Sequence, residues 1–238
     1  MNKSNFIEFT GLPGSGKTRL AHAATELLKE CTPEELVEFM EKANLPVLNN
    51  SGFGKVKTPL SLVTEVLLSP GIIRFPMAHA RNKAAVIRFY KLLALRKISR
   101  HLTSRPNVWV VEQHLLQGVW AFLLHCEHLT AHTDAIEELI HASYIRWPQA
   151  VFHLTLSPEI AIQRLQARQQ TSGHNPTDFD LMPNKALHSW FDRGAECITK
   201  LTGIMTKNGV PVITINADNT PEQMKAELEK SIRAILMS

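Results

Sequence analysis

Residues Gly11 to Thr18 read GLPGSGKT and match the pattern G-x-x-x-x-G-K-[ST]. Glycines in this pattern let the backbone wrap closely, so that successive N–H groups point at phosphate oxygens. The lysine, Lys17, reaches the β- and γ-phosphates of a nucleoside triphosphate, and the hydroxyl of Thr18 binds Mg²⁺. The sequence therefore predicts a loop that holds a triphosphate, formed by Gly11, Leu12, Pro13, Gly14, Ser15, Gly16, Lys17 and Thr18.

A second candidate residue, Glu112, directly follows the apolar run Asn107 to Val111, which is typical of a buried parallel strand. Ligands of parallel sheets bind at the carboxyl ends of the strands, so we expect Glu112 to face that crevice. A glutamate there can order Mg²⁺ through water or accept the proton of an acceptor hydroxyl. The pattern leaves both roles open, and a helix cap or surface acid is the alternative interpretation.

Two arginines, Arg164 and Arg168, lie four residues apart in a predicted helix and therefore share one face. The next stretch, QQTSGHNPTDFD, is rich in turn formers and predicts a mobile lid at about residues 168–182. Cations must meet the charge that builds on a transferred phosphoryl group. We interpret the two arginines as lid residues that close over this group, with a solvated helix face as the alternative.

The elements that must position these residues alternate between strands and helices. This alternation implies an α/β fold with a parallel sheet covered on both faces. Thr220, Pro221 and Gln223 form a capped start for the last helix. Strands are predicted at Asn5–Thr10, Asn107–Val111, Ala150–Leu156 and Val212–Ile215, and helices at Lys17–Lys29, Asn184–Asn208 and from Thr220 onward.

The composition is that of an ordinary globular protein, with 238 residues, 44% hydrophobic and 20% charged. This composition excludes a disordered chain. It also excludes a disulfide framework, because the 3 cysteines are widely spaced and no two of them form a CxxC pair. The apolar run at the N-terminus is too short for a secretory signal, and polar residues 112–114 interrupt the longest apolar stretch. We expect a cytoplasmic protein without a membrane segment.

The net charge of +4 is unevenly distributed along the chain. No acid occurs between Glu65 and Glu112, where nine lysines and arginines lie. Within a predicted long helix, Arg81 and Arg88 share a face and are our candidates for binding an anionic part of an acceptor. The bases otherwise surround the helix without an aromatic platform, which argues against nucleic-acid binding and leaves a solvated basic face as the alternative.

Four pieces of the chain together resemble the P-loop kinases of the thymidylate kinase and deoxynucleoside kinase group. They read FIEFTGLPGSGKT, WVVEQHLLQ, FHLTLSPEIAIQRLQAR and PVITINADNTPEQ. The resemblance implies a three-layer P-loop NTPase fold, a five-stranded parallel sheet in the order 2-3-1-4-5, and a mostly helical insertion at about residues 31–104. It also implies ATP with Mg²⁺ as donor, lid arginines at Arg164 and Arg168, and an adenine-facing loop near Asn216 to Asp218.

The chain departs from this group in two places. Thymidylate kinases usually carry an acid directly before the loop and an Asp-Arg pair after the third strand, whereas this chain has Thr10 and the sequence Glu112-Gln113-His114. Deoxynucleoside kinases have Glu-Arg at the second place, so Glu112 matches and Gln113 does not. The sequence therefore leaves open whether the acceptor is a nucleoside or a nucleotide.

We predict an ATP-dependent kinase, a single P-loop domain over residues 1–238, that acts on a small-molecule acceptor. Its catalytic residues would be Lys17, Glu112, Arg164 and Arg168, with Thr18 and Glu112 at the metal. The main alternative is a P-loop ATPase that acts as a nucleotide-driven switch on a protein partner. A metal cluster is a weaker alternative, at His125, Cys126, His128 and His132. The sequence leaves dimerisation open, although the kinases that it resembles often form homodimers.

Overall fold

The computed structural model describes residues 6–28, 88, 109–112, 115–126, 134, 136, 137, 140, 147–169 and 182–236. In this part of the chain strands are followed by helices, as the sequence predicts, and two successive helices precede the last strand. Their order is β1 (Phe6–Gly11), α1 (Lys17–Leu28), β2 (Trp109–Val111), α6 (Leu115–Leu123), β3 (Ala150–Thr155), α9 (Pro158–Gln169), α10 (Asn184–Lys207), β4 (Val212–Asn216) and α11 (Pro221–Leu236).

The described strands form one parallel sheet in the order β2-β1-β3-β4. If β2, β3 and β4 are counted as the third, fourth and fifth strands of the expected fold, this order is 3-1-4-5 and agrees with the prediction. The remaining strand of the expected five, the second, would fall between residues 29 and 108, outside the described residues. The α/β fold is confirmed, and β1 lies in the middle of the described sheet.

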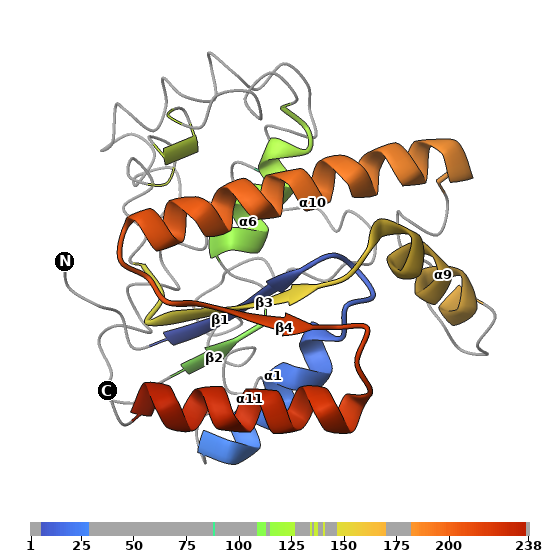
Figure 1. Cartoon of the computed structure of the whole chain (residues 1–238). Helices are drawn as coiled ribbons and strands as arrows, with labels where there is room; N and C mark the ends of the chain where they lie inside the picture. The colour runs from blue at the N-terminus through green and yellow to red at the C-terminus, as the bar shows by residue number, and fades with distance from the viewer. Residues whose placement is uncertain are drawn as a thin grey trace, which may run out of the picture.

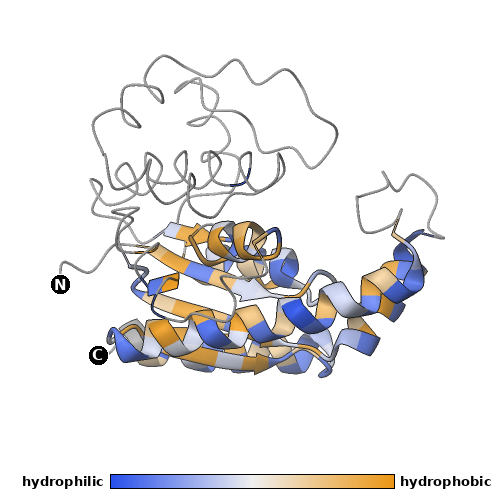
Figure 2. Ribbon diagram, turned by 90° about the horizontal axis from the view of Figure 1, so that it is seen from above, coloured by the Kyte–Doolittle hydropathy of each residue, from blue (hydrophilic) through white to orange (hydrophobic). Residues whose placement is uncertain are grey.

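Helices cover both faces of this sheet (Figure 1). Helices α6 and α10 pack together on one face, and α1 and α11 pack together on the other. The three layers are those that the sequence predicts. Figure 2 shows hydrophobic residues along the strands and both hydrophobic and hydrophilic residues along the helices.

Strand β1 is buried on both faces because it lies between two neighbouring strands and two helical layers. Phe9 stacks on Phe152 of β3 with ring centroids 5.0 Å apart, which joins the two strands on one face. Two polar residues of β1, Glu8 and Thr10, are also buried. The strand thus carries a carboxylate into the protein interior.

Local signals set the helix ends as predicted. Thr220 and Gln223 form the expected capping box: the Gln223 side chain accepts from the Thr220 N–H at 2.9 Å, and the Gln223 N–H donates to the Thr220 hydroxyl at 3.3 Å. The hydroxyl of Ser157 accepts from the Ile160 N–H at the start of α9. Helix α10 ends before Gly209, whose φ is +76°.

Several predicted features lie largely or wholly outside the described residues. These are most of the helical insertion at residues 31–104, including Arg81, and most of the lid at residues 168–182. Arg88 is described, and its backbone is helical. Among the described helices, none is both long enough and apolar enough to cross a membrane.

Candidate active site

The predicted phosphate-binding loop occupies the turn from β1 into α1, where the sequence places it. Gly11 ends β1 so close to β3 that a Cβ atom there would lie 2.6 Å from the carbonyl oxygen of Leu154. Gly14 has a φ of +84°, and a Cβ on it would lie 3.3 Å from the carbonyl oxygen of Ala161 in α9. Glycine is required at both places, and the loop is held between β3 and α9.

The hydroxyl of Ser15 lies inside this loop. It is buried, and its oxygen has no hydrogen-bond partner among the described residues. A buried hydroxyl without a partner is uncommon and has a free energy cost in the unliganded protein. A phosphate oxygen in the loop could accept a hydrogen bond from it, so this group fits the anion that the motif predicts.

Lys17, the first residue of α1, folds its side chain back over the loop. Its ammonium donates to the carbonyl oxygens of Gly11 and Leu12, both at 2.9 Å. Burial lowers the pKa of Lys17 from 10.5 to about 8, while the nearby carboxylate of Glu112 opposes the shift. The motif lysine therefore lies at the loop, and its protonation depends on its burial and on the Glu112 carboxylate.

The hydroxyl of Thr18 donates a hydrogen bond of 2.5 Å to a carboxylate oxygen of Glu112. Thr18 follows the loop that leaves β1, and Glu112 directly follows β2, the neighbouring parallel strand. A hydroxyl and a carboxylate are hard oxygen ligands of the kind that Mg²⁺ prefers, and Mg²⁺ usually keeps several waters or phosphate oxygens besides. This pair fits the predicted metal.

In the described part of the chain no group of three or more His, Cys, Asp or Glu side chains could hold a metal ion. Of the weaker alternative cluster, His125 and Cys126 are described, and they directly follow the end of α6. Its other members, His128 and His132, lie outside the described residues.

Arg164 joins two loops at the site. Its guanidinium donates to the carbonyl oxygen of Gly14 at 3.3 Å and to that of Ala217 at 2.9 Å. Ala217 belongs to the turn after β4, where the Asn216 side chain accepts from the Asp218 N–H. The arginine thus ties the phosphate-binding loop to the segment that the resemblance assigns to adenine.

Arg168 lies one turn further along α9 and is exposed. The two arginines share a face of the helix, as the spacing predicts. The structure brings Lys17, Thr18, Glu112 and Arg164 together around the loop. Arg168 lies in the last turn of α9.

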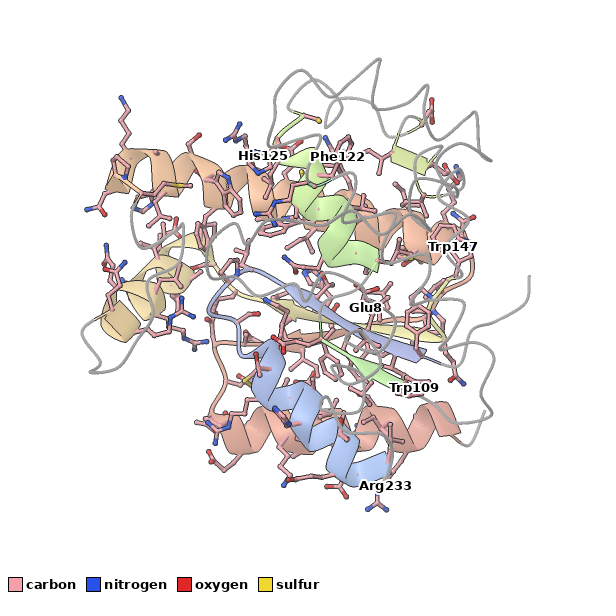
Figure 3. The ribbon with its side chains drawn as sticks, turned by 180° about the vertical axis from the view of Figure 1, so that it is seen from behind. Glu8, Trp109, Phe122, His125, Trp147 and Arg233 are labelled. Atoms are coloured by element: carbon pink, nitrogen blue, oxygen red, sulfur yellow. The ribbon has the colours of Figure 1, made fainter. Side chains whose placement is uncertain are left out.

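One residue of this region, Glu8, is absent from the sequence prediction. Its carboxylate is buried and accepts hydrogen bonds from the backbone N–H groups of Leu115, Leu116 and Gln117, at the start of α6. Figure 3 shows it on the side of the sheet that faces α6. The signal was present in the sequence, because an acid in the middle of an apolar strand is rarely buried unless partners satisfy it.

Another set of contacts places the layer formed by α6 and α10 against the loop. The indole of Trp120 in α6 donates to the carbonyl oxygen of Gly194 in α10 at 2.9 Å. A Cβ on Gly194 would lie 3.2 Å from the Trp120 ring and 3.3 Å from the side chain of Leu12. Helices α6 and α10 therefore meet directly against the phosphate-binding loop.

The chain is similar in sequence to a known kinase. The thymidylate kinase of Blochmanniella pennsylvanica (strain BPEN) is 25% identical over 235 residues, which span 96% of this chain and 95% of that protein. No family model matches the chain.

Solved structures of deoxyadenosine kinase from M. mycoides share the fold. The form with bound dCTP superposes with a TM-score of 0.53 at 12% identity, covering 96% of this chain and 99% of the other. The form with dCMP and dCDP gives a TM-score of 0.51 at 12% identity, covering 98% of this chain and 100% of the other. The chain therefore has the fold of these deoxyadenosine kinases, and its sequence resembles that of a thymidylate kinase over nearly its whole length.

Proposed function

We propose that this protein is an ATP-dependent kinase that transfers a phosphoryl group to a nucleoside or a nucleoside monophosphate. The observation that carries the proposal is the contact of Thr18 with Glu112 beside Lys17, at the end of the GLPGSGKT loop. These groups form a donor site for a triphosphate and its metal. The similarity to a thymidylate kinase and to deoxyadenosine kinases supports an acceptor of this class.

Each part of the donor site has a separate task in this proposal. The loop N–H groups and the Ser15 hydroxyl bind phosphate oxygens, and Lys17 exchanges its carbonyl partners for the β- and γ-phosphates. Thr18 and Glu112 hold Mg²⁺, directly or through water. When bound, Mg²⁺ neutralises charge on the phosphates, while the protein groups position them for transfer.

The two arginines of α9 differ in their surroundings, so we assign them different tasks. Arg164, which already holds Gly14 and Ala217, keeps the base side of the donor site together. Arg168, exposed at the end of α9, is the cation that closes over the transferred phosphoryl group with the lid.

The acceptor would bind against the insertion at residues 31–104 of the single domain, with Arg81 and Arg88 near its anionic part. A nucleoside monophosphate offers such an anion and a nucleoside does not. We place the activity in the cytoplasm, where ATP and these acceptors occur.

The test is ADP release from MgATP, measured with a panel of nucleosides, nucleoside monophosphates, sugars and amino-alcohol antibiotics. We expect one nucleoside or monophosphate to accelerate release. The variant Lys17→Ala serves as the blank, and it should lose roughly 10²-fold or more in turnover because a phosphate-binding cation is gone. Near-normal turnover in that variant contradicts the proposal. Slow release that only a protein partner accelerates would identify a nucleotide-driven switch instead.

A further inference from the structure

The buried carboxylate of Glu8 has no task in the donor site described above. Its side chain is 0% exposed, in the middle of β1. Its two oxygens accept from three backbone N–H groups at the start of α6, those of Leu115 at 3.1 Å, Leu116 at 2.7 Å and Gln117 at 3.3 Å. A buried carboxylate is costly unless such donors satisfy it, and the positive end of the helix dipole stabilises it further. Glu8 therefore anchors the beginning of α6 to the central strand.

The anchored turn is the one that carries Glu112. In the register of the sheet Glu8 lies opposite Val111, the residue directly before Glu112. Helix α6 begins at Leu115, three positions after Glu112. The turn that carries Glu112 is thus held at both ends by β1, through strand pairing on one side and through Glu8 on the other.

The partner of Glu112 is attached to the same strand. Thr18 is the last residue of the phosphate-binding loop, which begins at the end of β1. Both halves of the Thr18–Glu112 contact are therefore positioned relative to β1. If α6 were released from Glu8, Glu112 would be free to move while Thr18 stayed in place.

We propose that Glu8 is a positioning residue of the donor site, which keeps the turn carrying Glu112 against Thr18 by holding the first N–H groups of α6. The inference rests on the proposed function, because that function gives Glu112 its task at the metal. It goes further because it makes the position of Glu112 depend on Glu8, a residue that would touch neither nucleotide nor metal. A residue that only stabilised α6 would affect folding and leave the metal dependence of nucleotide binding unchanged.

The variant Glu8→Gln tests this inference. The amide keeps the size of the side chain but loses the charge and turns one acceptor oxygen into a donor that faces N–H groups. Phe122→Leu is the matched control, because Phe122 is a fully buried residue of the same helix, remote from the helix start. Both variants are first shown to be folded by circular dichroism at the assay temperature.

The first measurement is backbone hydrogen exchange of the protein without ligands. In Glu8→Gln we expect peptides covering residues 109–117 to exchange about tenfold faster, since an anchored helix start opens less often than a frayed one. In Phe122→Leu the exchange rate of these peptides, divided by that of the rest of α6, should equal the wild-type ratio. Unchanged exchange in Glu8→Gln overturns the inference, whatever the enzyme activity.

The second measurement is the ratio of the ATP dissociation constants in EDTA and in Mg²⁺. Glu8→Gln should lower this ratio as Glu112→Gln does, and the double variant should lower it no further, because both changes act through the same group. A wild-type ratio in folded Glu8→Gln, or an equal additional loss in the double variant, overturns the inference. The wild-type protein could bind ATP more tightly with Mg²⁺ and yet transfer a phosphoryl group to no acceptor. That result contradicts the kinase proposal and leaves the inference on Glu8 intact.

Discussion

Thr18 and Glu112 are 94 positions apart in the chain, and the hydroxyl of one donates to the carboxylate of the other at 2.5 Å. The contact exists because β1 and β2 are parallel neighbours and both end at the same edge of the sheet. It places two oxygen ligands beside the ammonium of Lys17, at the point where the motif expects a metal and the phosphates.

Replacement of Glu112 by Gln should weaken the use of Mg²⁺. We expect turnover to fall by about 10²-fold, and the Mg²⁺ concentration for half-maximal activity to rise, because a carboxylate at the metal is lost. Steady-state rates at varied Mg²⁺ measure both effects. Glu137→Gln is the matched control, since Glu137 pairs with Lys207 elsewhere on the molecule. Unaltered Mg²⁺ dependence in Glu112→Gln would remove this residue from the metal site.

The affinity for ATP should fall as the pH rises through about 8. Burial lowers the pKa of Lys17 to about 8, so the unliganded protein loses this charge above that pH, while the phosphates require it. Binding at pH 9 should therefore take up a proton. Calorimetry in buffers of different ionisation enthalpy measures this uptake, and Lys17→Met should lack it. Equal uptake in both proteins would assign the proton to another group.

The same shift predicts the pH dependence of stability. A lysine whose pKa is lowered on folding destabilises the folded state at low pH; this cost begins to fall when the folded protein loses the proton and is gone once the unfolded chain has lost it too. Relative to Lys17→Met, the free energy of unfolding should therefore rise between about pH 8 and pH 10.5. Urea titrations at several pH values measure it. A flat difference across this range would contradict the lowered pKa.

Arg164 and Arg168 should give different kinetic defects. Arg164→Lys loses the planar guanidinium that donates to the carbonyl oxygens of Gly14 and Ala217, so we expect the KM for ATP to rise about tenfold. In Arg168→Ala we expect a lower kcat with little change in that KM, because the residue would act on the transferred group. Steady-state kinetics with both substrates varied separates them. Identical defects in the two variants would show that they share one task.

Gly194 and Gly203, two glycines of α10, should respond oppositely to alanine. A Cβ on Gly194 meets the Trp120 ring at 3.2 Å, whereas a Cβ on Gly203 meets nothing within 4 Å. Gly194→Ala should lower the free energy of unfolding by about 1–3 kcal/mol through overpacking. Gly203→Ala should raise it by about 0.5–1 kcal/mol through helix propensity. Urea denaturation compares them, and equal effects would contradict the packing of α6 on α10.

Much of the fold could be predicted because its signals are local. Apolar runs mark β2 and β3, a capping box marks the start of α11, and glycines mark the phosphate-binding loop. Each signal depends on residues within a few positions of one another, so periodicity and residue type are sufficient to find it. Glu112 was also found from its place directly after a strand.

The partners of these residues could not be predicted in the same way. Glu8 reads as one acid in an apolar strand, and its three donors lie 107, 108 and 109 positions further along the chain. Arg164 reads as a lid residue, and its partner Ala217 lies 53 positions away. Which groups meet depends on strand order, register and the packing of α6 and α9, which no local pattern contains.

The sequence by itself therefore determined the α/β class, the phosphate-binding loop and the residues Lys17, Thr18 and Glu112 as candidates for its chemistry. The tertiary structure alone decided that Thr18 meets Glu112, that Glu8 anchors α6, and that burial lowers the pKa of Lys17. The physical reason is that hydrogen bonding across the fold and the loss of water around a charge exist only once distant segments have packed together.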